Sequence, residues 1–230
     1  MNRLNIPMPR EQVERVVRQL VREQFANRMK AGETTCTAEY YPNLVVNISA
    51  RHVHITQEDL EQLFGKGTEL TVFRWLYQPG EFAAEQQVAI VGPRQKMISQ
   101  VRILGPTRKK TQVELSFTDS IALGIDAPCR PSGSLEDTPG CILVGPAGHV
   151  ELKQGVIRAE RHVHMNPADA SFYGFSNGQR VRLRITSDCQ ITYENLLCRV
   201  NPKSLLEVHI DTDEGNASNL INATDVELLA

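Results

Sequence analysis

The spacing of hydrophobic residues changes near residue 44. From Pro9 to about Lys30, apolar residues recur at helical intervals, while Arg, Glu and Gln fill the opposite face. This periodicity predicts an amphipathic helix, followed over residues 31–39 by a small and polar linker. The pattern leaves two alternatives open: the helix packs on the body of the protein, or it stands apart from it.

From Leu44 onward the chain consists of short apolar runs separated by Gly, Pro and Asn, which is typical of a β-barrel or β-sandwich. Two short helices are expected among them, Thr56–Phe64 and Asn166–Tyr173, because each begins with a side chain suited to N-capping. The expected fold is therefore mostly β. The predicted strands are Leu44–Ile48, Gln87–Val91, Ile98–Leu104, Gln112–Phe117, Cys141–Val144, Val181–Ile185, Asn195–Val200 and Leu205–Ile210.

One segment of the chain occurs twice. Residues 51–54 and 161–164 both read Arg-His-Val-His, and each is followed by a helix-capping residue and an Asp in the first helical turn. Further along, each copy ends in a strand in which Glu114 of the first copy falls opposite His209 of the second. Thr118-Asp119 then matches Asp213-Glu214. This duplication predicts two related β-domains that each present two histidines and a third polar side chain at the same place.

The His-x-His pairs have a direct chemical interpretation. Side chains alternate across a strand, so residues i and i+2 point to the same face and two imidazoles there can hold one Zn²⁺ ion. We expect Glu114 to complete the first group and His209 to complete the second. Three protein ligands leave one position open, which is the arrangement of catalytic zinc sites. The expected metal ligands are His52, His54 and Glu114, and His162, His164 and His209.

The histidines also have other interpretations. A single His-x-His pair is more often a packing or hydrogen-bonding pair, but these two copies use five of the six histidines at matching positions. His149 lies outside the pattern and is expected to be exposed. His52 and His54 followed by Glu58 also fit the start of a cupin metal site. The second copy has Ala168 in place of that Glu, and the run after Glu58 is helical, so the cupin match is not repeated.

Composition and charge narrow the class of protein. The 230 residues carry a formal charge of −2, without the basic excess typical of nucleic-acid binders. No apolar run approaches the roughly 20 residues that span a bilayer, and the first residues lack the pattern of a secretory signal. The five cysteines include no Cys-x-x-Cys pair, which favours reduced thiols. We expect a soluble cytoplasmic protein that binds neither nucleic acid nor membrane.

Several ordered motifs make the chain resemble a known family. They include both Arg-His-Val-His segments, Gln78-Pro79-Gly80-Glu81, Gly105-Pro106-Thr107-Arg108 and His209-Ile210-Asp211-Thr212-Asp213-Glu214. From about Leu44 to Ala217 the sequence resembles the phosphate propanoyltransferases of propanediol-utilising bacterial microcompartments. It departs from the family pattern where Asn47-Ile48-Ser49-Ala50 replaces Gly-Val-Ser-Asn, at Phe117, and at Glu214-Gly215-Asn216.

The resemblance implies an activity and a set of ligand contacts. The family transfers a short acyl group between coenzyme A and inorganic phosphate with two zinc ions per active site, and the matching ligands are the same six side chains. Arg108 would bind phosphate. Guanidinium groups grip phosphates with paired hydrogen bonds, so arginines are suited to coenzyme A as well. The matching coenzyme A contacts are Ile48, Ser49, Ala50, Arg94, Arg102 and Asn216.

The resemblance also implies an organisation and partners. One β-barrel would combine residues 43–51 with 160–230, and the other would span residues 52–159. Residues 1–42 resemble the peptides that carry enzymes into a microcompartment lumen, so shell proteins are possible partners, and a homo-oligomer is left open. Two rival functions are a cupin-like metal-dependent oxygenase and a non-catalytic assembly module stabilised by zinc.

Overall fold

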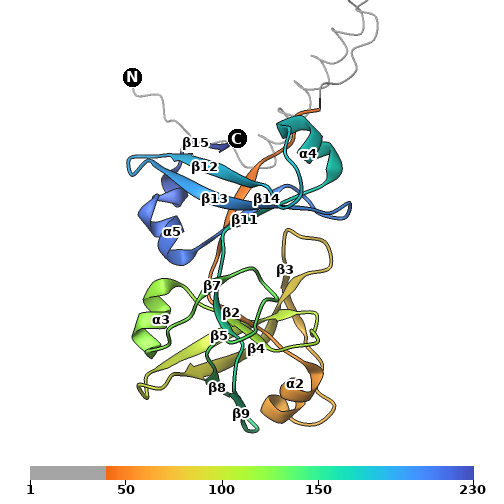
Figure 1. Ribbon diagram of the computed structural model, residues 1–230. Helices are drawn as coiled ribbons and strands as arrows, with labels where there is room; N and C mark the ends of the chain where they lie inside the picture. The colour runs from red at the N-terminus through yellow and green to blue at the C-terminus, as the bar shows by residue number, and fades with distance from the viewer. Residues whose placement is uncertain (1–39) are drawn as a thin grey trace, which may run out of the picture. The chain divides into compact units, whose positions relative to one another are not determined.

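The computed structural model describes residues 40–230 (Figure 1). The expected N-terminal helix and its linker fall on residues 1–39 and lie outside the described residues. Residues 42–230 form one compact unit, which is mostly β and contains two curled half-barrel sheets. In the part of the chain that the structure describes, no helix is both long and apolar enough to cross a membrane.

The six-stranded sheet combines one early strand with the C-terminal part of the chain. In β12 the apolar residues Val181, Leu183 and Ile185 are buried and the intervening arginines are exposed, so the strand has one core face and one solvent face. In spatial order its strands are β1 (Val45–Ser49), β14 (Glu207–Asp211), β11 (His162–Met165), β13 (Ile191–Val200), β12 (Arg180–Thr186) and β15 (Asp225–Leu229).

The nine-stranded sheet is built from residues 52–159 around a second apolar core. Val53, Ile103 and Val113 lie on neighbouring strands and are fully buried there. In spatial order the strands are β7 (Cys129–Arg130), β10 (Val156–Ala159), β6 (Gln112–Glu114), β2 (His52–His54), β5 (Met97–Gly105), β4 (Phe82–Val91), β8 (Cys141–Val144) and β9 (His149–Leu152), with β3 (Val72–Trp75) paired to β4. His149 is exposed, as expected, but begins strand β9.

Four short helices cap the sheets. The two predicted helices are α2 (Gln57–Phe64) and α4 (Pro167–Tyr173), N-capped by Thr56 and Asn166. The other two, α3 (Phe117–Leu123) and α5 (Thr212–Ala217), follow β6 and β14. The predicted strand Gln112–Phe117 is therefore too long. Strand β6 ends at Glu114 because the Ser116 hydroxyl accepts a hydrogen bond from the Asp119 amide and starts α3.

The two halves exchange one strand each. Strand β1 leads directly to His52, yet it pairs in parallel with β14, where Asn47 lies opposite His209. Strand β10 leads to His162, yet it pairs in parallel with β6, where Ile157 lies opposite Glu114. Because the exchange is reciprocal, β14 lies between β1 and β11, and β6 lies between β10 and β2. Each of these two central strands therefore has one neighbour from each half of the chain.

Candidate active site

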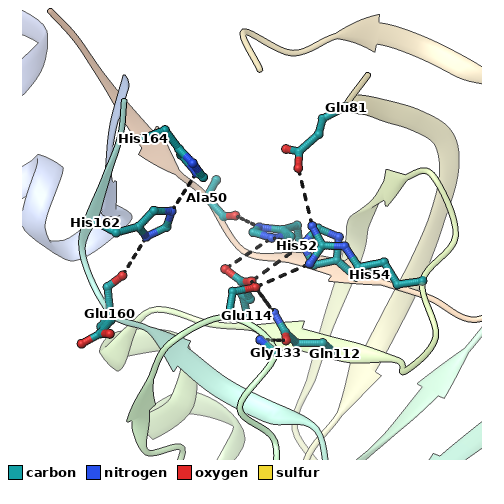
Figure 2. A network of polar contacts seen from close by, with 12 residues as sticks. Ala50, His52, His54, Glu81, Gln112, Glu114, Gly133, Glu160, His162 and His164 are labelled. Carbon is teal, nitrogen blue, oxygen red and sulfur yellow. Dashed lines mark hydrogen bonds and ion pairs between the residues drawn. The ribbon is translucent and has the colours of Figure 1, made fainter. Parts of the chain in front are cut away.

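The first histidine pair converges on Glu114. Strands β2 and β6 are antiparallel, and His52 lies directly opposite Glu114. His52 Nε2 is 3.1 Å from His54 Nε2 and 3.4 Å from Glu114 Oε2, and His54 Nε2 is 3.7 Å from Glu114 Oε1. Ligands about 2.0–2.1 Å from a tetrahedral zinc ion are separated from one another by roughly 3.4 Å. The three side chains, drawn in Figure 2, therefore fit one metal ion without rearrangement.

The second group repeats this arrangement with three histidines. His162 lies opposite His209 in the antiparallel pair of β11 and β14. His162 Nε2 is 3.1 Å from His164 Nε2, the same separation as in the first pair. The His209 ring centroid lies 5.0 Å from that of His162 and 5.2 Å from that of His164. One nitrogen from each ring lies within 4.8 Å of the others, so this group also fits a metal.

Backbone carbonyls fix the orientation of one ring in each pair. His52 Nδ1 lies 2.8 Å from the Ala50 oxygen, and His162 Nδ1 lies 2.9 Å from the Glu160 oxygen. A carbonyl oxygen only accepts hydrogen bonds, so Nδ1 carries a proton in both rings and Nε2 is the nitrogen that faces the other side chains of its group. The hydrogen bond to the carbonyl is the outer-shell contact that orients metal-binding histidines in proteins. Burial alone would lower the pKa of His52, but Glu114 more than offsets it and the pKa is raised.

Burial keeps most of the site histidines neutral. It lowers the pKa of His54 and of His164 to about 3, and that of His162 to about 4, with help from neighbouring histidines and arginines. Burial alone would raise the pKa of Glu114, but His52 and His54 more than offset it and hold the carboxyl ionised. Neutral imidazoles and an ionised carboxylate are the forms that bind metals.

The third residues of the two groups have different polar neighbours. In the first group, Glu114 Oε1 accepts hydrogen bonds from Gln112 and from the Ser132 hydroxyl, the latter at 3.0 Å. In the second group, the position of Gln112 is taken by Glu207, whose Oε2 lies 3.0 Å from His209 Nε2. This buried carboxylate also accepts from Asn47 Nδ2 at 2.6 Å.

Gln78 reaches Glu207 from the other sheet. Its Nε2 donates to Glu207 Oε2 at 2.7 Å and to the Leu205 carbonyl at 3.0 Å. Its own oxygen accepts from the Leu205 amide at 3.2 Å. Although burial raises the pKa of Glu207, the contacts from His209, Asn47 and Gln78 lower it to about 2. Glu207 therefore stays ionised behind His209.

Each Arg-His-Val-His segment is tied to the helix that follows the opposite strand. Arg51 Nε lies 2.8 Å from Asp119 Oδ2 in α3, and Arg161 Nε lies 2.7 Å from Glu214 Oε1 in α5. These pairs occupy equivalent positions of the repeat. They explain the matching Arg and acidic residues of the two copies as supports for the histidine strands.

A large cavity opens beside the metal-binding groups. Its volume is about 520 Å³, within the range typical of ligand pockets, and His52 and His209 both line it. The exposed aromatic side chains of Phe73, Trp75 and Tyr77 form another wall. We call this the aromatic cavity. A much smaller cavity of about 20 Å³ is bordered by Glu114, His162 and His209, so the two groups are neighbours.

The residues expected to contact coenzyme A divide into two sets. Ile48, Ser49, Ala50 and Arg102 all line the aromatic cavity. The Arg102 guanidinium is 4.3 Å from the centre of the Phe73 ring, and one of its nitrogens donates to the Ala84 carbonyl at 2.7 Å.

Arg94 and Asn216 do not line the aromatic cavity. Arg94 lies in the turn between β4 and β5, where its Nη1 is 3.3 Å from the Ile121 carbonyl oxygen. Asn216 is exposed on α5. The structure thus brings only part of the expected set together.

Two arginines lie near the histidine groups. Arg108 Nη2 is 3.7 Å from Glu81 Oε1, and its Nη1 is 3.5 Å from the Ser132 hydroxyl. Burial lowers the pKa of Arg108, and the positive charge of Arg199 adds to that effect. The positive charge of Arg199 also contributes to lowering the pKa of His162 and of His164. Arg108 was predicted from the sequence and Arg199 was not. Arg199 lies opposite His164 on β13, and the equivalent position of the first copy, on β5, holds an apolar residue.

The structure also bears on the rival ligand sets. Glu58 is exposed on α2 and belongs to neither group, so Glu114 rather than Glu58 accompanies His52 and His54. Within residues 40–230, each group contains three His or Glu side chains and no fourth. The closed four-ligand set of a structural zinc site is therefore absent from this part of the chain.

Comparison with known proteins identifies the family of this chain. The sequence model of the family described as phosphate propanoyltransferase matches residues 45–221. A phosphate propanoyltransferase of Planctopirus limnophila is 56% identical over 222 residues, which cover 96% of this chain and 91% of that protein. Those of Thermotoga maritima and Listeria monocytogenes are 47% and 44% identical over 80% of this chain, covering 88% and 86% of their own lengths. The chain therefore belongs to the phosphate propanoyltransferases, a family of acyltransferases.

Proposed function

We propose that the protein transfers a propanoyl group reversibly between coenzyme A and inorganic phosphate at a centre of two zinc ions. The observation that carries this proposal is the pair of three-residue groups, built by one repeat, beside a cavity large enough for the thioester end of a coenzyme A ester. His52, His54 and Glu114 would hold one zinc ion, and His162, His164 and His209 would hold the other.

The proposed reaction is a direct transfer that needs no covalent enzyme intermediate. An oxygen of hydrogen phosphate attacks the thioester carbonyl carbon, a C–O bond forms and the C–S bond breaks. The sulfur leaves with the bonding electron pair, and the proton of hydrogen phosphate ends on the thiol of coenzyme A. Bound zinc would supply positive charge to the developing oxyanion and to the departing sulfur.

The chain's own residues would bind and orient the two reactants. The aromatic cavity would hold the acyl-coenzyme A, with Ile48, Ser49 and Ala50 along one side and Arg102 at the Phe73 wall. Arg94 and Asn216 belong to the proposed contacts only for the outer part of coenzyme A, because neither lines the cavity. Arg108 would grip phosphate with its guanidinium fork, and the charge of Arg199 would add to that attraction.

One experiment separates this function from its rivals. Purified protein is assayed for release of coenzyme A from propanoyl-coenzyme A with and without phosphate, and its metal content is measured. Release that requires phosphate, with two zinc ions per chain, supports the proposal. An iron-loaded protein with oxygen-dependent activity favours the cupin-like oxygenase. Zinc without any turnover favours the assembly module.

We also propose that residues 1–42 direct the enzyme to a microcompartment lumen through shell proteins, on the basis of sequence resemblance. Deletion of residues 1–40 should leave specific activity unchanged and abolish co-sedimentation with shell particles. A large fall in melting temperature or in activity would instead favour a helix that packs on the body of the protein.

A further inference from the structure

We propose that phosphate and acyl phosphate reach the metal centre through an entrance of their own, separate from the aromatic cavity. This entrance, which we call the anion entrance, is lined by His164, Asn177, Arg199, Asn201, Lys203 and Ser204. The inference rests on the proposed function and extends it, because it assigns the two substrates to different openings.

The two openings are distinct and lie on either side of one loop. The anion entrance has a volume of about 430 Å³, and the aromatic cavity has about 520 Å³. They share only Gln78 and Glu81, which stand in the loop between β3 and β4. Gln78 is anchored to Leu205 and Glu207 by three hydrogen bonds, so this divider is held in place.

The linings differ in a way that matches the two substrates. The aromatic cavity has Phe73, Trp75 and Tyr77 on its wall, which suits the uncharged pantetheine arm of a coenzyme A ester. Its three arginines, Arg51, Arg74 and Arg102, suit the phosphates of the same molecule. The anion entrance contains no Phe, Tyr or Trp side chain. It carries the cations Arg199 and Lys203, three amides, and one carboxylate, Glu81, which pairs with Arg108. Such donors suit a small, doubly charged oxyanion.

Arg199 is a half-buried cation that has no counter-charge among the described residues. Its guanidinium forms no hydrogen bond or ion pair with a described residue, whereas Arg108 has Glu81 and Arg102 has the Ala84 carbonyl. Arg199 is half-buried and repels Arg108 electrostatically. An anion lying between these guanidinium groups would relieve that repulsion, and the anion entrance leads to this point beside His164.

A ternary complex needs such a second route. A thioester that fills the aromatic cavity lies against His52 and His209, so it blocks that approach to the metal centre. Phosphate must then arrive, or acyl phosphate leave, from the side of His164. A non-reactive coenzyme A analogue should accordingly compete with acyl-coenzyme A and leave the binding of phosphate unchanged.

The test alters the rim of the anion entrance without touching a proposed ligand. Lys203→Glu reverses the charge of an exposed side chain, and Ser204→Trp narrows the opening. We expect each variant to raise the KM for phosphate and for acyl phosphate about tenfold. The KM values for coenzyme A and acyl-coenzyme A should change less than about twofold, with zinc content and Tm unchanged. Lys153→Glu, an exposed charge reversal away from both openings, is the matched control.

Several outcomes would overturn the inference. One is an unchanged KM for phosphate in both variants, and another is an equal rise for both substrates. Direct phosphate binding to the zinc-loaded protein keeps the test independent of turnover. If the wild type does not transfer acyl groups, the proposed function fails. Weaker phosphate binding by Lys203→Glu than by Lys153→Glu would then still support the entrance, and equal binding would refute it.

Discussion

The two copies of the repeat place their carboxylates differently. The first copy ends in Gln112-Val113-Glu114, so its carboxylate belongs to the metal-binding group. The second ends in Glu207-Val208-His209, and its carboxylate lies behind the third histidine, 3.0 Å from the ring nitrogen. Each half therefore keeps one buried carboxylate on this strand, at a different distance from the proposed metal. The comparison suggests that the two zinc ions would receive unequal electron donation from the same scaffold.

Loss of the third ligands should give the largest effects. Glu114→Gln and His209→Gln are each expected to bind one zinc ion per chain in place of two. Activity should fall by more than the roughly 100-fold that outer-shell changes cost. Metal analysis and the phosphate-dependent assay check both variants. Two bound zinc ions in either variant would show that the three-residue groups are not the metal sites.

The arginines should give the next largest effect. Arg108→Ala and Arg199→Ala each remove a charged hydrogen-bond donor worth about 1.5–3 kcal/mol, so kcat/KM for phosphate should fall about 10- to 100-fold. Zinc content should stay the same. Lys at either position should restore activity only in part, since it lacks the two-pronged guanidinium group. Unchanged phosphate kinetics in Arg108→Ala would refute its role.

Loss of the Glu207 carboxylate should weaken zinc binding less than loss of a direct ligand does. It should weaken zinc binding at the His162 group more than at the His52 group. Glu207→Gln is expected to weaken zinc binding at the His162 group about 10- to 100-fold, because His209 loses an ionised partner. Competition with a chelator should show an unchanged zinc affinity at the His52 group. Gln112→Ala is the matched variant, and it should weaken the first site instead. If Glu207→Gln weakened zinc binding equally at both groups, Glu207 would not distinguish the two metal sites.

The cysteines offer the smallest effect and a test of how the halves unfold. Burial raises the pKa of Cys141 to about 12 and that of Cys198 to about 11, and each thiol lies in a different core. Neither should react with a thiol reagent in the native state, while the exposed Cys129 and Cys189 should react. Because the halves exchange strands, Cys141 and Cys198 should become reactive at the same denaturant concentration. Separate transitions would show that the halves unfold independently.

The longer elements could be predicted from the sequence because their apolar residues alternate or recur over many positions. Strands β4, β5, β12 and β13 have 7–10 residues each, and all four were expected at least in part. Strands β3, β7, β9 and β15 were missed. They have 2–5 residues each. Strands β3 and β7 are exposed at every position, and β9 and β15 each bury a single residue, so none has a long burial pattern.

The six metal-binding candidates could be predicted because they occur twice at matching positions. Gln78, Arg199 and Glu207 could not, because none has a counterpart of the same type in the other copy. They become neighbours of the histidines through strand pairing over long sequence distances, such as the 129 residues between Gln78 and Glu207. Arg94 was expected to contact coenzyme A, and this stays a prediction. Its turn packs near Leu123 and Gly124 and does not line the aromatic cavity.

The strand exchange has a consequence for synthesis on the ribosome. Asn47 in β1 contacts Glu207 in β14, which is made 160 residues later. At translation rates of about 5–20 residues per second, β1 waits roughly 8–30 seconds for its partner. During that time its backbone groups are unpaired and open to other nascent chains. The newborn protein should therefore depend on chaperones until its last strands emerge.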